Sequence, residues 1–201
     1  MWENIAAKLE GSLVVLEPLE SRHEESLYRI AKDARIWRWM PYNAAESRGS
    51  FSTWLEDALE ASDAGSEAAF AVFDASTSVP VGSTRYLTLR PSHCALEIGW
   101  TWFSCSVWGT GVNMEAKLLL LEHAFERLDC LRVEFKTDSR NERSRAALEA
   151  LPARFEGILR KHMLVRGGER GDSAFYSVID EEWPEVKASL ERRLELASRK
   201  R

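Results

Sequence analysis

A short loop with two glycines, Gly109 and Gly111, joins a predicted strand over residues 96–103 to a predicted helix over 112–128. The helix is amphipathic, because apolar residues recur in it at steps of four and three. Glycine adopts the backbone angles of a tight turn without a steric penalty. A helix N-terminus adds N–H groups without a partner and a partial positive charge. The loop therefore predicts a site for an anion such as a diphosphate.

Spacing alone leaves the function of this loop open, since a tight structural turn needs the same glycines. A nucleotide-hydrolysing P-loop is excluded because no Gly-Lys-Ser or Gly-Lys-Thr follows. A Rossmann dinucleotide site fits the order of strand, loop and helix, and Glu134 follows downstream. Against it, residues 104–108 lengthen the loop, Met114 stands in the third glycine position, and too little chain remains for a second nucleotide-binding half.

The segment before the loop is predicted to contain one strand, two helices and then three consecutive strands. A strand over 13–16 precedes a helix over 20–32, in which His23 is expected on the surface. A second helix carries Phe51, Trp54, Leu55 and Leu59 at helical spacing. Strands over 68–73 and 79–89 flank a turn at 74–78, and with the strand at 96–103 they predict an antiparallel meander.

The second half alternates helices with strands. The long helix is expected to carry Glu115 on its polar face, and Leu131, Val133 and Phe135 then alternate with charged residues, which predicts a strand buried on one face. A helix over 141–151 ends at Pro152, and 155–165 pairs with 173–179. A charged helix over about 181–199 closes the chain. We expect an α+β fold in a single domain over residues 1–201, because neither a repeat nor a linker divides it.

The composition limits the partners. The 201 residues include 27 Lys and Arg against 32 Asp and Glu, a formal net charge of -5. This balance argues against nucleic acid and an anionic membrane, which need clustered basic residues, and suits an amine substrate, although it is also common in soluble enzymes. Cys94, Cys105 and Cys130 have no paired spacing, which predicts free thiols and no metal site. Without an export signal or a membrane-length apolar stretch, a cytoplasmic location is expected.

Four spaced motifs resemble the GNAT acetyltransferase superfamily. They are Glu97-Ile-Gly-Trp100, Val107-Trp-Gly-Thr-Gly111, Asn141-Glu-Arg-Ser144 and Glu156-Gly157. The likeness runs from residues 13–19 through 39–41 to 172–176 and 182–183, and it is greatest to the RimJ/RimL-like N-terminal acetyltransferases of ribosomal proteins. The resemblance implies a mixed, mostly antiparallel sheet that is splayed at its middle and flanked by helices, with acetyl-CoA in the gap as the acetyl donor.

The resemblance also implies which residues hold acetyl-CoA. The pantetheine arm would pair with the backbone of Trp102, Phe103 and Ser104, and Asn141 would hold the arm or an ordered water. The diphosphate would lie on Trp108, Gly109, Thr110, Gly111, Val112 and Asn113. No metal is required, because the amine attacks the thioester carbonyl directly and a backbone N–H group stabilises the oxyanion.

Two side chains are candidates for proton transfer. The resemblance implies that Ser144 lies near the thioester sulfur as a proton donor, and the alternative is a helix-start hydroxyl. Glu97 is the first candidate base, acting through water. Strand alternation equally permits Glu97 to face solvent or to pair with Arg85. Where some relatives carry a further carboxylate, this chain has His162, which is either a substitute base or a surface residue.

The acceptor is expected to be a primary amine, either a peptide N-terminus or a small molecule. Trp37, Trp39 and Met40 either wall its pocket, as the resemblance implies, or fill the core between the first two helices. Ser106 and Pro152 depart from the family pattern, which favours Gln or Arg and glycine there. These departures and the missing carboxylate leave an alternative open, a non-catalytic domain that binds acetyl-CoA. A homodimer is compatible with the resemblance.

Overall fold

The structure is a computed structural model that describes residues 2–198. Its eight strands form one sheet in the order β1-β2-β3-β4-β5-β6-β8-β7. The strands are β1 (Leu9–Glu10), β2 (Val14–Pro18), β3 (Ala68–Asp74), β4 (Pro80–Arg90), β5 (Ala95–Phe103), β6 (Arg132–Asp138), β7 (Arg154–Val165) and β8 (Glu169–Ile179). The α-helices are α1 (Glu24–Ala31), α2 (Ala34–Trp37), α3 (Arg48–Asp63), α4 (Val112–Glu126), α5 (Glu142–Ala150) and α6 (Trp183–Ser198). Three short 3₁₀ turns are η1 (Ser21–His23), η2 (Pro91–His93) and η3 (Cys105–Val107).

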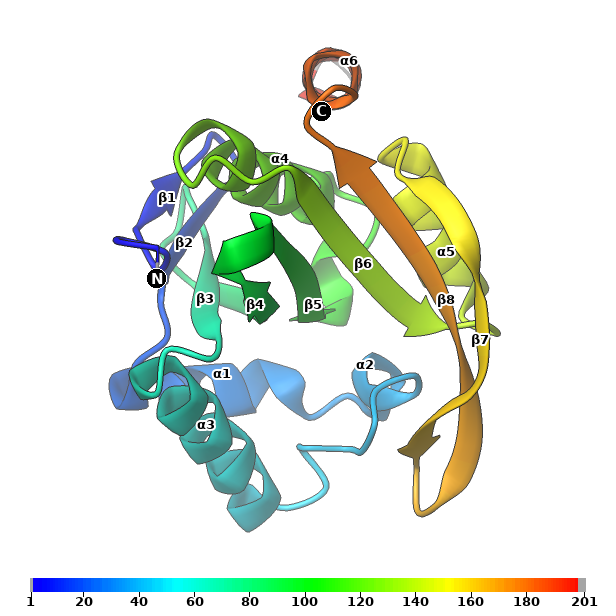
Figure 1. Cartoon of the computed structure of the whole chain (residues 1–201). Helices are drawn as coiled ribbons and strands as arrows, with labels where there is room; N and C mark the ends of the chain where they lie inside the picture. Colours follow the sequence, from blue (N-terminus) through cyan, green and yellow to red (C-terminus); the bar gives the residue numbers. More distant parts are fainter. Residues whose placement is uncertain (1, 199–201) are drawn as a thin grey trace.

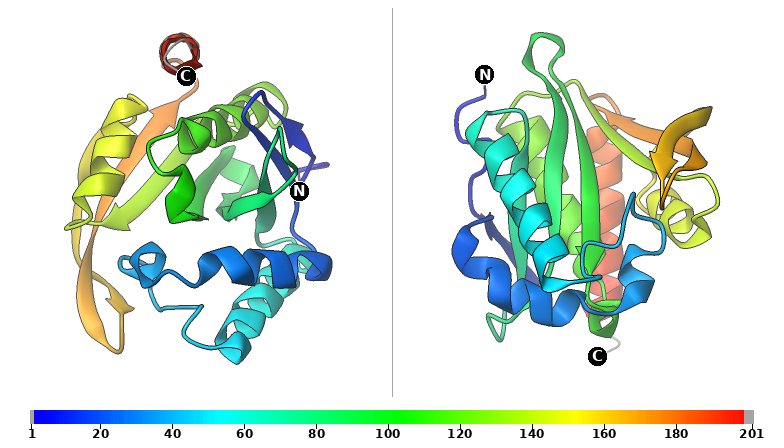
Figure 2. Two further views of the ribbon diagram at one scale, coloured as in Figure 1. Left: turned by 180° about the vertical axis from the view of Figure 1, so that it is seen from behind. Right: turned by 90° about the horizontal axis from the view of Figure 1, so that it is seen from below.

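Helices cover both faces of the sheet. Helices α1, α2 and α3 lie on one face, and α4 and α6 lie on the other (Figure 1). Figure 2 shows the first group from below, in front of the strands. Successive side chains of a strand point to opposite faces. Accordingly, Phe70 and Val72 of β3 join the core under α4 and α6, while Ala69 and Ala71 join the core under α1 and α3.

The sheet opens between β5 and β6, its parallel pair. The two strands pair over three positions, the last of which joins Glu97 to Glu134. Both strands continue beyond this point, β5 to Phe103 and β6 to Asp138, without pairing with each other. The edge of β5 that faces β6 therefore carries backbone groups that no neighbouring strand uses. This opening confirms the expected α+β fold with a mixed, mostly antiparallel, splayed sheet.

A bulge in β5 lies beside the opening. Gly99 pairs with Arg85 of β4 and Trp102 pairs with Ser83, so two residues of β5 oppose the single residue Thr84. Trp100, the first of the two, has a φ of 48°. A bulge of this kind redirects the side chains next to it. Here it bends the strand at the point where β5 leaves β6.

Helix α4 is held in front of the opening by a buried carboxylate. Glu115 is 5% exposed and accepts hydrogen bonds from the backbone N–H groups of Ser12, Leu13 and Val14 and from the Ser12 hydroxyl, at 2.6–3.1 Å. The expectation that Glu115 lies on a polar face is wrong. The helix is buried on most of its circumference, whereas the hydrophobic period reports one face.

Three further differences separate the structure from the sequence-based expectations. Strand β1 was not predicted, because two residues are too short for a period. His23 is buried, and its ring lies against that of Phe73. Its Nδ1 accepts a hydrogen bond from the Glu20 N–H at 3.1 Å, and burial lowers the pKa of its imidazole. The C-terminal helix begins at Trp183 instead of 181, and position 199 lies outside the described residues.

Candidate functional site

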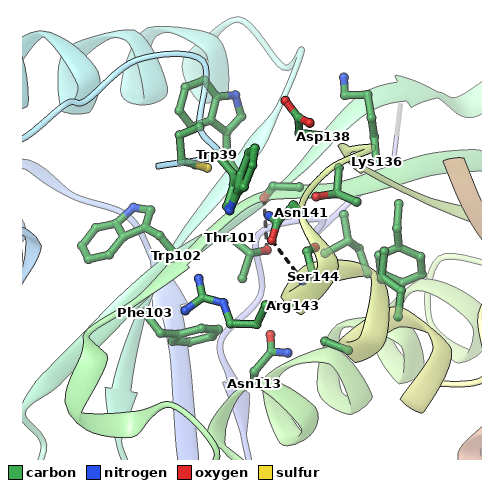
Figure 3. A pocket seen from close by; sticks show the side chains of 18 of the residues that line it. Trp39, Thr101, Trp102, Phe103, Asn113, Lys136, Asp138, Asn141, Arg143 and Ser144 are labelled. Carbon is green, nitrogen blue, oxygen red and sulfur yellow. Dashed lines mark hydrogen bonds between the residues drawn. The ribbon is translucent and has the colours of Figure 1, made fainter. Parts of the chain in front are cut away.

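A cavity of about 490 Å³ occupies the opening between β5 and β6. Its walls come from both strands, from the N-terminal ends of α4 and α5, from residues 39–41 and from β8. Figure 3 shows side chains from these elements converging on one space. Most of the candidate residues line it: Glu97, Trp102, Phe103, Trp108, Gly109, Gly111, Asn113, Asn141, Ser144, Trp39 and Met40.

The glycine loop closes one end of the cavity. Gly109 has a φ of 78° and Gly111, which precedes the first turn of α4, has a φ of 94°. Both values lie in the left-handed region that favours glycine. The indole N–H of Trp108 donates to the carbonyl oxygen of Phe103 at 3.0 Å, which holds the loop against the end of β5. The first N–H groups of α4 have no carbonyl within the helix to bind, so this end suits an anion.

A cation lies against this loop. The guanidinium of Arg143, on α5, stacks 3.6 Å from the centroid of the Trp108 ring and lines the cavity. No carboxylate within residues 2–198 forms an ion pair with Arg143. Burial lowers its pKa from the ordinary arginine value. Because an arginine side chain does not lose its proton in proteins, the loop meets a positive charge without an ion-pair partner in the described part of the chain.

Asn141 and Ser144 lie at the start of α5, at the middle of the cavity (Figure 3). The side-chain oxygen of Asn141 accepts the Ser144 N–H at 3.2 Å, which makes Asn141 the cap of this helix. The alternative that Ser144 is the helix-start hydroxyl is therefore wrong. The amide N–H₂ of Asn141 and the hydroxyl of Ser144 belong to side chains that line the cavity and can bind a ligand there.

Glu97 lies at the floor of the cavity, where β5 and β6 part. It is 4% exposed, accepts the Thr88 hydroxyl at 3.3 Å and lies 3.6 Å from the Lys136 ammonium. Burial raises the pKa of Glu97, and Lys136 opposes this effect. Glu97 does not face solvent, and Arg85 pairs with Glu67 instead, at 3.0 Å. Both structural alternatives for Glu97 are therefore wrong, and a carboxylate with a raised pKa is suited to accept a proton.

Sequence reasoning missed another titratable group in the cavity, Lys117 of α4. Its side chain is buried, and its Nζ donates to the Thr101 hydroxyl at 2.9 Å. Burial lowers the pKa of Lys117 to about 7, while the nearby Glu97 carboxylate opposes the shift. One sequence signal could have found it: Lys117 lies three and four residues before Leu120 and Leu121, on a face of the predicted helix that is otherwise apolar.

The end of the cavity away from the glycine loop is lined by apolar side chains and by a carboxylate, that of Asp138. Trp39, Met40 and Pro41 line it, and the N–H of Arg166 donates to the Pro41 carbonyl oxygen at 2.6 Å. The Arg166 guanidinium also pairs with Asp138 at 2.7 Å, so the β7–β8 hairpin ties the 39–41 loop to β6. Although burial acts in the opposite direction, hydrogen bonds from Arg140 and Arg166 lower the pKa of Asp138 to about 2.

Four of the residues predicted to bind a ligand lie outside the cavity lining. Trp37 is in the core, where its indole N–H donates to the Ala31 carbonyl oxygen at 2.7 Å, as the second alternative for this residue expected. The other three are Ser104, Thr110 and Val112. Of these, the Ser104 N–H donates to the Val81 carbonyl oxygen at 2.8 Å and the Thr110 N–H to the Val107 carbonyl oxygen at 3.4 Å, while Val112 is the first residue of α4. His162 is exposed and hydrogen-bonds Ser173, so it matches the surface alternative.

The structure also bears on metals, thiols and membranes. Residues 2–198 contain no group of three or more His, Cys, Asp or Glu side chains arranged to hold a metal ion. The three cysteines are free, and burial raises the pKa of both Cys105 and Cys130. None of the described helices is long and apolar enough to cross a membrane.

Comparison with known proteins points to one family. The sequence profile described as "Acetyltransferase (GNAT) domain" matches residues 14–154. A crystal structure of a GCN5-related N-acetyltransferase from Brucella melitensis is 30% identical, with a TM-score of 0.86 over 94% of this chain and 86% of that one.

Two more distant structures share the fold. RimJ of Mycobacterium smegmatis, in complex with CoA-disulfide, is 22% identical, with a TM-score of 0.79 over 93% of both chains. RimL, the ribosomal L7/L12 alpha-N-protein acetyltransferase, is 18% identical, with a TM-score of 0.76 over 86% of this chain and 93% of that one. At these identities the likeness is one of fold.

Proposed function

Because this chain belongs to the GNAT acetyltransferase family and is therefore an acyltransferase, we propose that it transfers the acetyl group of acetyl-CoA directly to a primary amine. The observation that carries the proposal is the cavity between β5 and β6, which has the glycine loop and the start of α4 at one end and Glu97 at its floor. A donor and an acceptor can enter such an opening from opposite sides and meet at its centre. That arrangement favours transfer within a ternary complex over a covalent enzyme intermediate.

The end of the cavity at α4 fits the coenzyme. The edge of β5 that faces the opening, along Trp102 and Phe103, can pair with the amides of a pantetheine arm, as an added strand would. The Ser104 N–H is not available for this pairing, because it donates to the Val81 carbonyl oxygen at 2.8 Å. The N–H groups of Gly109 and of residues 111–113, together with the α4 dipole, suit a diphosphate. The N–H groups of Trp108 and Thr110 donate to the Cys105 and Val107 carbonyl oxygens instead. Asn141 would bind the arm through its amide N–H₂. Acetyl-CoA supplies the acyl group in activated form, as a thioester.

Arg143 is proposed as the cation that completes the diphosphate site. The family pattern favours Gln or Arg at position 106, where this chain has Ser106. The guanidinium stacked on Trp108 brings a positive charge to the same loop from α5. A phosphate that bonds both to backbone N–H groups and to a guanidinium gains charge-assisted hydrogen bonds. Arg143 would thereby supply the polar or positively charged group that the family pattern has at position 106.

The proposed chemistry needs one base and a stabilised leaving group. An amine attacks a carbonyl carbon only when neutral, and its nitrogen then becomes positively charged and must lose a proton. Glu97 is the proposed acceptor of that proton, directly or through water. Its raised pKa brings it closer to the pH at which such a base works. The Ser144 hydroxyl is proposed to donate a hydrogen bond to the departing sulfur.

The acceptor is proposed to be a protein N-terminus or a small primary amine that enters beside Trp39, Met40 and Pro41. These apolar side chains suit the first side chain of a peptide, while Glu97 attracts the amino group. The fold shared with RimL, which acts on a ribosomal protein N-terminus, supports the peptide as the first acceptor to test.

The test has two stages. Calorimetry with acetyl-CoA should give a dissociation constant in the micromolar range, and peptides with a free N-terminus or small amines should then release free thiol in proportion to acetylated product. N-terminally blocked peptides are the matched control. Absence of heat with acetyl-CoA would overturn the proposed cofactor. Cofactor binding without thiol release for any amine would overturn the transfer and favour the non-catalytic alternative.

A further inference from the structure

A lysine occupies a position of α4 at which its neighbours along the buried face are apolar. Lys117 is 7% exposed, and Ala116, Leu120 and Leu121 around it are buried in the core. Lysine is rarely buried to this degree, because removing an ammonium from water is costly unless it gains a partner. Lys117 lines the cavity between β5 and β6. Its position therefore combines burial with access to a ligand.

The contacts of Lys117 leave most of its hydrogen-bonding capacity unused. Its Nζ donates to the Thr101 hydroxyl at 2.9 Å, and lies 5.4 Å from the centroid of the Phe135 ring on β6. The Thr101 hydroxyl also shares a hydrogen bond of 2.7 Å with Thr84. An ammonium carries three donors, and one is taken within residues 2–198. The others are available to a group in the cavity.

The bulge in β5 explains why Nζ is held where the strands part. It places Thr101 and Trp100 together opposite Thr84, so that the Thr101 hydroxyl lies within reach of both Thr84 and Lys117. Phe135 supports the ammonium from the other strand. Lys117 thus contacts both β5 and β6 at the opening in which acetyl-CoA is proposed to bind.

We propose that the Lys117 ammonium gives its proton to the departing thiolate of coenzyme A, an inference that rests on the acetyl transfer proposed above. Ser144 alone does not complete this step, because a serine hydroxyl donates a hydrogen bond but holds its proton tightly near neutral pH. A lysine in the same cavity supplies a proton that it can release and regain. Thr101 is then a positioning residue, since it holds Nζ at the opening.

The step is balanced in protons and bonds. The acceptor nitrogen forms a bond to the acetyl carbon as the carbon–sulfur bond breaks, and the electron pair of that bond stays on sulfur. The sulfur takes a proton from Lys117, and the acceptor nitrogen loses one to Glu97. Glu97 and Lys117 then return to their starting states when the proton passes from the first to the second through solvent. The products are the amide and the free thiol of coenzyme A.

The charges around Lys117 suit this role. On β5, Glu97 favours its charged form, while on β6 Lys136 turns toward Glu97. On its own helix, Glu115 is held by residues 12–14 and is not directed to the cavity. On α6, Lys187 pairs with Glu122 and Glu126, and on β8 the cavity is lined by Asp172. With a pKa of about 7, Lys117 is matched to proton transfer near neutral pH.

The first test measures ionisation of the bound thiol rather than activity. Coenzyme A is bound to the wild type, to Lys117→Met and to Lys117→Arg, and thiolate formation is followed by ultraviolet absorbance against pH, with the protein alone subtracted. A permanent positive charge beside the sulfur favours the thiolate, so the thiol pKa should be at least about one unit lower in Lys117→Arg than in Lys117→Met. Because Lys117 itself loses its proton near pH 7, before the thiol does, the wild type should lie between the two variants. Equal thiol pKa values in all three proteins would overturn the proposal.

The second test measures turnover against pH with a weakly basic acceptor, a hydrazide, that stays neutral throughout. The wild-type kcat should fall at alkaline pH as Lys117 loses its proton, and Lys117→Met should lack this limb and turn over about 100-fold more slowly. Lys117→Arg should also be slow, because arginine does not release its proton. An alkaline limb that survives in Lys117→Met would contradict the proposal.

The control is Lys187→Met, which removes an ion-paired lysine of α6 outside the cavity and should leave both measurements unchanged. Lys117→Met should unfold at the same temperature as the wild type or higher, since a buried amine is replaced by an apolar side chain of similar length. If the wild type itself binds no coenzyme A or releases no thiol, the proposed function fails. If it does both and Lys117→Met behaves like the wild type, only this inference fails.

Discussion

The guanidinium of Arg143 stacks 3.6 Å from the centroid of the Trp108 indole ring, so the start of α5 brings a cation to the loop in front of α4. The expected role of this pair is to bind the diphosphate of acetyl-CoA.

Replacing Arg143 with Met should weaken acetyl-CoA binding by about tenfold, since a hydrogen bond to a charged group contributes about 1.5–3 kcal/mol. S-acetylpantetheine, which lacks the diphosphate, should bind the wild type and the variant equally. Calorimetry with both donors measures this difference. Arg29→Met, which removes an exposed arginine paired with Glu25, is the matched control. A loss of the same size for both donors would show that Arg143 acts on the cavity in general.

Glu97→Gln should lower kcat by about 100-fold or more while the dissociation constant of acetyl-CoA changes little. The amide keeps the shape of the side chain but does not accept a proton from the amine. Wild-type kcat should fall at acid pH as Glu97 is protonated, above the ordinary pH for a carboxyl, because burial raises its pKa. The variant should lack that limb in a pH profile of thiol release. A variant with wild-type kcat would transfer the role of base to another group.

The raised pKa of Glu97 also predicts how stability changes with pH. The folded protein holds this proton more tightly than the unfolded chain does, so wild-type stability falls as pH rises through the interval above the ordinary value of 4.5. Glu97→Gln does not titrate. Urea unfolding between about pH 5 and 8 should therefore show the wild type losing stability relative to the variant. A difference that stays constant over this range would mean that Glu97 titrates normally.

Glu115→Gln should lower the free energy of unfolding by about 2–4 kcal/mol, because it weakens charge-assisted hydrogen bonds and points an N–H₂ group at backbone donors. Chemical denaturation measures the change. Glu122→Gln, which alters an exposed carboxylate of the same helix paired with Lys187, should cost less than about 1 kcal/mol. Similar losses for both variants would mean that the turn at residues 11–14 does not depend on this carboxylate.

The two neighbouring tryptophans should separate stability from acceptor binding. Trp37→Ala empties a core position and should cost about 3–5 kcal/mol of unfolding free energy. Trp39→Ala removes a half-buried ring from the cavity wall, so it should raise the KM for the acceptor several-fold with a much smaller loss of stability. Thermal unfolding and acceptor titrations on both variants measure this. If Trp37→Ala raised the KM for the acceptor and Trp39→Ala did not, the acceptor would bind beside Trp37 and not beside Trp39.

Much of the fold could be predicted from local patterns. The steps of four and three in α4 and the period of two in β6 located these elements within a few residues, because a helix and a strand each repeat their buried face at a fixed interval. The two glycines located the anion-binding loop, since positive φ angles favour this residue. Asn141 and Ser144 were found through resemblance to a family and Glu97 as a carboxylate on a predicted strand, and all three line one cavity.

What the amino-acid sequence determined by itself was the order of the longer elements, without β1 and α2, the glycine turn before α4 and the family. Tertiary structure alone decided that Arg143 reaches Trp108, that Glu115 is buried at the turn of residues 11–14, and that Lys117 meets Thr101. The physical reason is that periodicity records one buried face of one element. These three contacts join residues distant in the chain. Because α4 is enclosed on several sides, its charged residues find their partners on other elements, which only the folded structure brings next to it.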